Sequence, residues 1–209
     1  EPAAKSRSWR FRLGAAGGSS SVGRPRGALG RADVALLVVG ASEGVTDGGQ
    51  RVARFAEERG CAMVVLLNKW DLLKDDEERD EVIEQVSEKL VFVGFAPVLR
   101  VSALTGRGMD KVYALVDAVY AAYSRQIATS AVNKLLTQLR ETGHTVSKHG
   151  ASLRLQYGTQ TRTNPPGFAF FANHPRLVDD NYRRFLENRM REAFDLTGTP
   201  IMLSFKQKG

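Results

Sequence analysis

The sequence predicts an α/β protein in which a doubly wound, largely parallel sheet is followed by a small α+β domain. Strand-like and helix-like stretches alternate between residues 32 and 123, which is the element order of a doubly wound sheet. Residues 64–67 are four consecutive aliphatic residues, typical of a strand buried on both faces. Beyond residue 129 the apolar pattern changes to helix, strand, strand, helix and strand. We therefore expect two domains, residues 32–124 and 125–209, behind a first segment of residues 1–31.

The composition is that of an ordinary globular protein. Of the 209 residues, 43% are hydrophobic and 25% are charged, which suffices for a buried core. The apolar runs are far shorter than a membrane span, so no membrane partner is expected. Cys61 is the only cysteine, which excludes an intrachain disulfide and favours simple packing in a reducing compartment. His144, His149 and His174 lack the spacing of metal ligands, so no metal site is expected.

Charge is distributed unevenly along the chain. Residues 1–31 carry seven Lys and Arg against one Glu, residues 32–142 carry 13 basic against 17 acidic residues, and residues 143–209 carry ten against five. The two ends are therefore basic and the middle is acidic. This pattern suggests an anionic macromolecular partner contacted by the ends, although a basic surface without a specific partner would give the same numbers.

Periodicity places the elements of the first domain. Residues 34–39 form an apolar strand, and Thr46 is placed to cap a helix over residues 50–59 that Gly60 ends. After the strand at 64–67, an acidic helix is expected over residues 75–90, a strand over 98–101 and a helix over 109–123. The acidic start of the second helix is favoured by the helix dipole and does not require a metal.

The second domain is expected to contain two helices and three strands. Its helices cover residues 131–140 and 181–194, and its strands cover residues 151–157, 168–172 and 201–205. Residues 158–164 are polar and are expected to form a connection, ended by Pro165-Pro166-Gly167. Both faces of the strand at 168–172 are apolar, so we expect one face to pack on the two helices and the other to pack against the first domain, with Phe170 and Phe171 supporting this docking.

A polar loop, Asn68-Lys69-Trp70-Asp71, follows the most buried strand. Open α/β sheets bind ligands at the carboxyl ends of their strands. A carboxylate at Asp71 can accept two parallel hydrogen bonds from the ring N–H and the exocyclic amine of guanine, whereas adenine offers no such donor pair. The Lys69 stem can lie along a base, and the Asn68 amide can link this loop to its neighbours.

A second loop follows the next strand and begins with Ser102-Ala103. There the backbone N–H of Ala103 is placed to donate to the guanine carbonyl oxygen, where adenine carries an amine. The tetrapeptide alone would fit an ordinary charged loop. The two loops together favour guanine recognition.

These two loops resemble the fourth and fifth motifs of the GTPase superfamily, Asn-Lys-x-Asp and Ser-Ala-x. Three further segments resemble the C-terminal KH-like domain of the Der (EngA) family: residues 164–168 (NPPGF), 182–188 (YRRFLEN) and 198–201 (GTPI). The resemblance runs from about Ala32 to the end of the chain. It implies an incomplete P-loop-GTPase-like doubly wound sheet followed by a KH-like domain. It also assigns guanine contacts to Asn68, Lys69, Asp71, Ser102 and Ala103.

The resemblance implies a function as well. Der proteins are bacterial and plastid GTPases with two tandem G domains, implicated in assembly of the large ribosomal subunit. We would thus expect a GTP-binding protein that uses GTP or GDP, with Mg²⁺ only in a complete G domain. Its partners would be the large ribosomal subunit and rRNA, and it would be a monomer. It would be located in the bacterial cytoplasm or, alternatively, in the plastid stroma.

The basic helix near the C-terminus provides candidate contacts to rRNA phosphates, namely Arg183, Arg184, Arg189 and Arg191. Equally, these arginines would suit a solvated face or a face that packs on the first domain. The Gly-x-x-Gly loop with which KH domains clamp single-stranded RNA does not occur after Arg125.

The sequence also departs from the family. No Gly-x-x-x-x-Gly-Lys-Ser/Thr phosphate loop occurs in the 209 residues, and Gly14 to Gly17 stand where Asp-x-x-Gly would be. Residues 9–13 resemble the strand before the second switch, so residues 1–31 are a basic tail or the remnant of a switch region; read alone, they also look like part of a transit peptide.

The chain is then either a fragment of a Der-like protein or a degenerate relative, and we assign no catalytic residue. We expect weak GTP binding and negligible hydrolysis by these residues alone. The alternative function is a non-catalytic rRNA-binding or ribosome-binding protein that keeps relic guanine motifs. A nucleotide-binding enzyme of another α/β family fits less well, because the guanine motifs occur as a pair.

Overall fold

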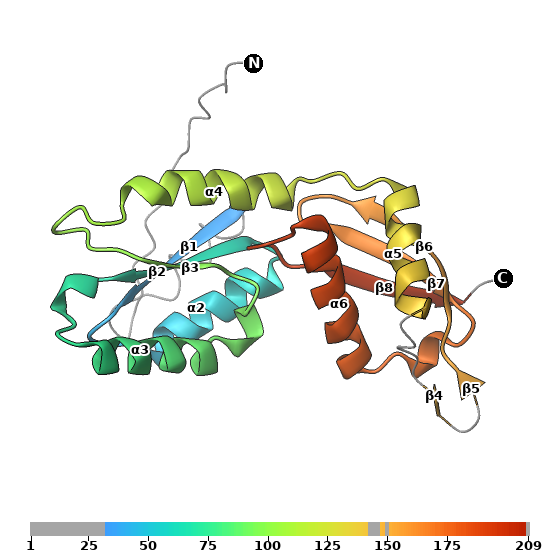
Figure 1. Cartoon of the computed structure of the whole chain (residues 1–209), viewed down its shortest axis with the longest axis horizontal. Coiled ribbons are helices and arrows are strands. Elements are labelled where there is room, and N and C mark those ends of the chain that lie inside the picture. Colours follow the sequence, from blue (N-terminus) through green and yellow to red (C-terminus); the bar gives the residue numbers. More distant parts are fainter. Residues whose placement is uncertain (1–31, 142–146, 149–150, 208–209) are drawn as a thin grey trace, which may run out of the picture.

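The computed structural model describes residues 32–141, 147–148 and 151–207. Figure 1 shows two sheets side by side along the long axis, each with its own helices. The expectations for residues 9–17, His144 and His149 lie outside the described residues. Within the described residues, no helix is both long and apolar enough to cross a membrane.

The N-terminal sheet is parallel, as the sequence predicts. Its strands have the order β1 (Val34–Gly40), β2 (Ala62–Asn68) and β3 (Val98–Arg100). The connecting helices are α2 (Asp47–Glu58), α3 (Asp76–Lys89) and α4 (Asp110–Tyr123). Short 3-10 turns, η1 (Trp70–Leu72) and η2 (Val91–Val93), complete this part.

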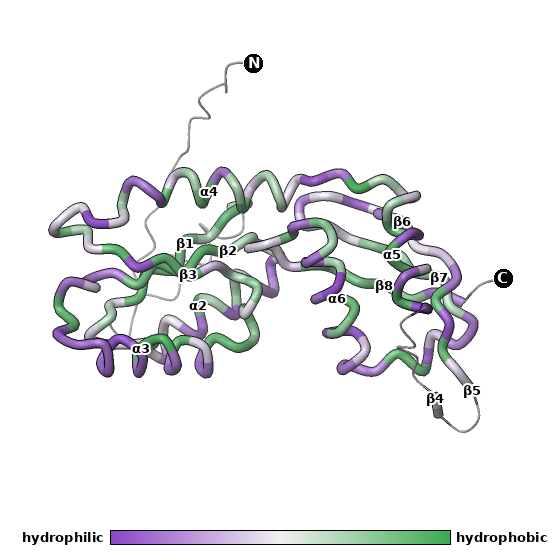
Figure 2. The backbone as a smooth tube through the Cα atoms, in the orientation of Figure 1, coloured by the Kyte–Doolittle hydropathy of each residue, from purple (hydrophilic) through white to green (hydrophobic). Residues whose placement is uncertain are grey.

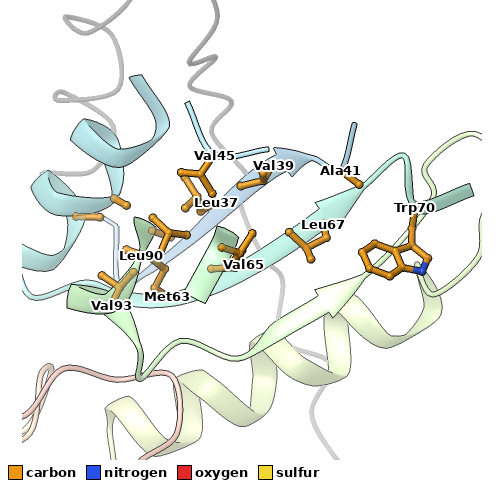
Figure 3. Close-up of a cluster of buried hydrophobic side chains, with 14 of the residues drawn as sticks. Leu37, Val39, Ala41, Val45, Met63, Val65, Leu67, Trp70, Leu90 and Val93 are labelled. Carbon is orange, nitrogen blue, oxygen red and sulfur yellow. The ribbon is translucent and has the colours of Figure 1, made fainter. Parts of the chain in front are cut away.

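The aliphatic run of β2 is buried because helices cover both faces of this sheet. Met63, Val65 and Leu67 pack in one core with residues of α2 and α3 (Figure 3), while Val64 and Leu66 pack in a second core with α4. Figure 2 accordingly shows the backbone along β1 and β2 in the green of hydrophobic residues. A strand that alternates between two cores needs no polar face, which explains its sequence.

Both helices expected before and after β2 are present, although α2 starts at Asp47 and not at residue 50. The Thr46 side chain accepts a hydrogen bond of 3.1 Å from the Gly49 N–H, and Asp75 accepts one of 2.9 Å from Glu78. Gly60 ends the segment after α2 with a φ of 73°, a conformation that side chains disfavour. Local capping chemistry therefore decides where these helices begin and end.

The C-terminal part is built on a three-stranded mixed sheet. β6 (Leu155–Arg162) pairs antiparallel with β7 (Gly167–Ala172), which pairs parallel with β8 (Met202–Gln207). Helices α5 (Thr129–Glu141) and α6 (Asp180–Phe194) accompany it, with a small hairpin, β4 (Ser147–Lys148) and β5 (Ala151–Ser152), and a 3-10 turn, η3 (Pro175–Leu177). The single strand expected over 151–157 is wrong in its bounds, because residues 151–152 belong to β5 and the strand of this sheet runs from Leu155 to Arg162.

Both helices cover the same face of this sheet. Phe168 and Phe170 of β7 are buried in one core with Leu136 of α5 and with Leu186 and Met190 of α6. Phe171 lies on the opposite face, and the ring contact seen there is with the C-terminal part itself and not with the N-terminal part, as docking of this face would require. There the Phe171 ring lies 5.9 Å from the ring of Tyr157, which is 45% exposed.

One place where the two parts meet is the loop after α6, residues 195–201, which we call the junction loop; another is the turn after β6, where the Asn164 N–H donates to the Tyr123 carbonyl over 3.1 Å. The Met63 N–H donates to the Gly198 carbonyl over 2.7 Å, and the Gly198 N–H donates to the Phe95 carbonyl over 2.9 Å. The Arg191 guanidinium lies 5.3 Å from the centre of the Phe95 ring. The C-terminal part is thus hydrogen-bonded directly to the start of β2.

Candidate functional site

Three loops meet at the carboxyl ends of the parallel strands. The register places Gly40 beside Asn68 and Leu67 beside Arg100, so β1, β2 and β3 end at the same edge. Two backbone hydrogen bonds link these ends, from Ala41 N–H to the Asn68 carbonyl (2.8 Å) and from Trp70 N–H to the Val101 carbonyl (3.2 Å). This edge is where an open α/β sheet binds ligands.

Asn68 links the two loops that the sequence singled out. Its side-chain Oδ1 accepts a hydrogen bond of 2.9 Å from the backbone N–H of Ala103. The role in joining neighbouring loops is therefore present in the structure. The same bond occupies the Ala103 N–H that we expected to donate to a guanine carbonyl.

Lys69 adopts a left-handed conformation, with a φ of 62°. Its Nζ donates to Oε1 of Glu43 over 2.9 Å, and the two side chains are 49% and 65% exposed. Glu43 comes from the loop after β1, and sequence reasoning missed it because no motif marks that position. An ion pair this exposed contributes little to stability, so Lys69 can exchange it for a ligand at small cost.

Trp70 anchors the loop that carries Asp71. Its side chain is buried with Leu67 and Ala41 in the core beneath the sheet edge (Figure 3), and the Arg100 guanidinium lies 5.1 Å from its ring centre. Lys69 and Asp71, on either side of it, are exposed. One buried residue thereby fixes two polar neighbours at the surface.

Ser102 is buried and forms hydrogen bonds within the second loop. It is 1% exposed, its Oγ accepts from the Thr105 N–H (3.1 Å), and its own N–H donates to the Arg107 carbonyl (3.0 Å). Gly108 closes the loop with a φ of 76°, and a Cβ there would lie 2.6 Å from the Arg100 carbonyl oxygen. The Ser102 side chain therefore shapes the loop and does not point to solvent.

The four arginines of α6 differ in their surroundings. Arg183 donates to the Leu203 carbonyl (2.9 Å), and Arg191 donates to the carbonyls of Leu196 and Thr199 (2.7 Å each). Arg189 pairs with Glu192 at 3.1 Å at the surface, and Arg184 is exposed. Burial lowers the pKa of Arg191 and raises that of Glu187, which also feels the charge of Glu57 in the other part.

The described residues contain no group of three or more His, Cys, Asp or Glu side chains that could hold a metal ion. The groups gathered at the sheet edge are an amide, an ammonium and a carboxylate, which suit a polar planar ligand. These are the side chains of Asn68, Lys69 and Asp71, whose contacts to a guanine base remain a prediction.

Two protein-family models match the chain in succession. Residues 22–125 match the GTP-binding domain of elongation factor Tu, and residues 126–206 match the KH-domain-like C-terminal domain of EngA bacterial GTPase enzymes. Era structures are also similar: one bound to MgGDPNP and a 16S ribosomal RNA segment has a TM-score of 0.42 at 16% identity, covering 90% of this chain and 69% of that chain. An Aquifex aeolicus Era variant bound to GDP and AlF4⁻ has a TM-score of 0.40 with the same coverage.

Curated relatives match across both parts. GTPase Der of Moorella thermoacetica is 40% identical over 188 residues, and that of Synechococcus sp. strain JA-3-3Ab is 41% identical over 191 residues. Each alignment covers 90% of this chain but only 43% and 42% of the relative, so the chain spans less than half their length. The chain therefore belongs to the Der (EngA) family of GTPases and corresponds to the C-terminal part of its members.

Proposed function

We propose that this chain recognises the guanine base for a Der-type GTP-binding protein that acts in biogenesis of the large ribosomal subunit. Residues 32–124 form the base-recognition part of a G domain, and residues 125–209 form a KH-like domain. The observation that carries the first half of this proposal is the Asn68–Ala103 hydrogen bond of 2.9 Å, which holds the two predicted guanine loops against each other.

Asp71 is the group that selects the base. Its exposed carboxylate stands next to a buried tryptophan, so its backbone is fixed while its oxygens remain available. A fixed carboxylate accepts from both donors on the guanine edge, and adenine cannot supply them. The Ala103 N–H donates to Asn68, so it can favour guanine over adenine only when it leaves Asn68 and donates to the guanine carbonyl. Most of the discrimination between guanine and adenine therefore rests on Asp71.

The phosphate half of the nucleotide needs groups beyond those at this edge. Backbone N–H groups of a phosphate loop, its lysine and a magnesium-bound hydroxyl supply most of the triphosphate affinity in such proteins. The 209 residues contain no such motif. We therefore place GTP, GDP and Mg²⁺ in a complete G domain and expect GTP turnover by these 209 residues to equal that of buffer.

Titration of the ¹⁵N-labelled chain with GDP and with ADP tests base recognition. GDP should shift the amide signals of residues 68–71 and 102–105 with a dissociation constant of about 1 mM or weaker, since only a few hydrogen bonds contribute. ADP should not. Asp71→Asn should lose the response to GDP and gain one to the xanthosine diphosphate, whereas the control Asp110→Asn should behave like the parent. Equal responses to GDP and ADP would contradict the assignment.

We further propose that the exposed arginines of α6 contact rRNA phosphates. Arg183 and Arg191 are held by backbone carbonyls, so Arg184 and Arg189 are the better candidates. Contacts to several phosphates release counterions, which makes affinity fall steeply with salt. The compartment that would supply this partner is the bacterial cytoplasm or the plastid stroma, and we expect the protein to bind as a monomer.

Cosedimentation with large ribosomal subunits tests this contact. Arg184→Glu with Arg189→Glu should weaken it, and raising the salt concentration should weaken the parent in the same direction. The double variant Arg51→Glu with Lys111→Glu changes the net charge by the same amount at exposed positions of α2 and α4, and serves as the control. Equal loss in both double variants would make the effect non-specific. Ribosome binding without any guanine response would favour the alternative, a non-catalytic ribosome-binding protein with relic guanine motifs.

A further inference from the structure

The loop after β1, residues 41–45, which we call the β1 loop, brings an acidic side chain to the candidate base site. Glu43 lies in its middle, and its side chain is 65% exposed. Ala41 and Val45, at the two ends of the loop, are 1% and 2% exposed and belong to the core drawn in Figure 3. The Ala41 N–H also donates to the Asn68 carbonyl over 2.8 Å. The β1 loop is therefore anchored at both ends, beside the residue that links the other two loops.

Helix α3 holds the second half of the β1 loop from the side. The Gln85 side chain accepts from the Val45 N–H over 3.2 Å, and the Lys89 ammonium donates to the Val45 carbonyl over 2.9 Å. Gly44 has a φ of 68°, and a Cβ at this position would overlap the Gln85 side chain. These contacts favour one conformation of the loop, so the backbone of Glu43 has a defined place.

The Glu43 carboxylate reaches across the end of β1 to Lys69. The Glu43 N–H donates to the Gly40 carbonyl over 3.1 Å, which turns the chain back over the strand end. A Cβ built on Gly40 would lie 3.6 Å from both Cδ and Oε1 of Glu43, so a large side chain there would compete with the carboxylate for space. Oε1 accepts from Lys69 Nζ over 2.9 Å. The ion pair therefore joins the β1 loop to the loop that follows β2.

An anchored ammonium restricts the stem of Lys69. The stem runs from a backbone in the left-handed conformation, with a φ of 62°, to the end that Glu43 holds. A free lysine side chain loses much rotamer entropy when it is ordered against a ligand. The stem is also the part of Lys69 that can lie along a base. Because Glu43 orders the stem before a ligand arrives, less entropy remains to be lost on binding.

We propose that Glu43 is a positioning residue for guanine recognition, which holds the Lys69 ammonium so that the stem lies along the face of the base. This role rests on the proposed function and adds a third loop to the base site. The ion pair stays closed when the base binds, because the base contacts the stem and the carboxylate contacts the ammonium. Glu43 acts through Lys69 and not on the edge of the base, so selection of guanine over adenine stays with Asp71.

A double-mutant cycle with GDP as the probe tests this role, by titration of the ¹⁵N-labelled full chain. Glu43→Gln keeps the shape and removes the charge, and should raise the dissociation constant for GDP about 2- to 5-fold, the range of an exposed ion pair. Lys69→Met keeps an apolar stem without the ammonium, so Glu43→Gln should have no further effect in that background. Glu81→Gln is the matched control, because it removes one negative charge from an exposed position of α3.

Two further measurements distinguish positioning of Lys69 from a general structural role. The difference in GDP affinity between the parent and Glu43→Gln should shrink in about 1 M salt, where the screening length is roughly 3 Å. NMR relaxation of the Lys69 Cε group, measured without ligand, should give a lower order parameter in Glu43→Gln than in the parent. A loss of fold would change neither quantity in this selective way, and circular dichroism checks that each variant is folded.

Three results would overturn the role of Glu43. They are equal GDP affinity of the parent and Glu43→Gln, an effect of Glu43→Gln that persists beside Lys69→Met, and a Lys69 Cε order parameter that Glu43→Gln leaves unchanged. Failure of base recognition gives a different result, because the parent then shows no response to GDP or responds equally to GDP and ADP. The positioning role at a base falls with it in that case, before any variant is compared.

Discussion

Asn68 connects the two loops that a guanine base would contact. Its Oδ1 accepts from the Ala103 N–H over 2.9 Å, and its backbone carbonyl accepts from Ala41 over 2.8 Å. One residue at the end of β2 thus touches the loops after β1 and after β3. A net contribution of about 0.5 to 1.5 kcal/mol is typical of such a bond. Its structural effect is larger, because it sets the distance between the two loops.

Substitution of Asn68 tests this role. Asn68→Ala removes the acceptor, so exchange of the Ala103 amide hydrogen should accelerate and the free energy of unfolding should fall by about 1 kcal/mol. Asn68→Asp keeps an oxygen at the same place and should preserve protection of Ala103. Hydrogen exchange measured by NMR gives both values. Protection of Ala103 that survives Asn68→Ala would show that the loop is held by its own hydrogen bonds at Ser102.

For single residues, the sequence predicts a role correctly where the interacting groups belong to one motif or to neighbouring loops. The link through Asn68 follows from an amide placed at a strand end. The Lys69–Glu43 ion pair was not predicted, because Glu43 is 26 residues away in a loop without a recognisable pattern. The hydrogen bond from the Ala103 N–H to Asn68 was likewise not predicted, and the contact of this N–H with a guanine carbonyl stays a prediction. Motifs therefore identify the residues more reliably than their partners.

At the scale of elements, strands buried on two faces and capped helices were predictable. The strands β1 and β2 follow from aliphatic runs, α2 follows from the cap at Thr46, and α3 follows from its acidic start and apolar stripe. These signals are short-range: a cap acts within one turn, and a two-sided burial pattern appears in consecutive residues. In both cases the tertiary contacts favour the same structure as the local sequence, so the prediction holds.

β6 shows where element prediction failed. Alternation favours residues 151–157, but the paired strand is Leu155–Arg162, which includes polar residues expected to form a connection. β6 lies at the edge of its sheet, where Asn133 of α5 both donates to the Gly158 carbonyl (2.9 Å) and accepts from its N–H (3.0 Å). Helix side chains thus satisfy backbone groups that a further strand would pair. A polar edge strand supported in this way has no sequence signature of its own.

At the scale of the molecule, the junction loop forms hydrogen bonds that join the C-terminal part to the N-terminal sheet. Gly198 exchanges hydrogen bonds with both Met63 at the start of β2 and Phe95 in the segment that leads to β3. Arg191 of α6 holds the loop from the other side through the carbonyls of Leu196 and Thr199. In the sequence, residues 198–201 carry a resemblance to the KH-like domain and no sign of a contact with β2. Their contact with β2 is 135 residues away along the chain, beyond the reach of any local pattern.

Gly198 is the position where this arrangement is most sensitive. A Cβ there would lie 2.5 Å from Cγ2 of Val119 and 3.2 Å from Pro97, and its φ is 75°. Gly106 has nearly the same φ, 78°, with nothing within 4 Å of its Cβ position. Gly106→Ala should therefore lower the free energy of unfolding by about 1 to 2 kcal/mol, because alanine disfavours the left-handed conformation. Gly198→Ala should lower it by a further 1 to 3 kcal/mol, roughly, because the added methyl group overpacks the contact with Val119. Chemical denaturation measures the free energies, and hydrogen exchange should show loss of protection at the Met63 amide in Gly198→Ala alone. Equal destabilisation by the two substitutions, with Met63 still protected, would mean that the two parts fold and move independently.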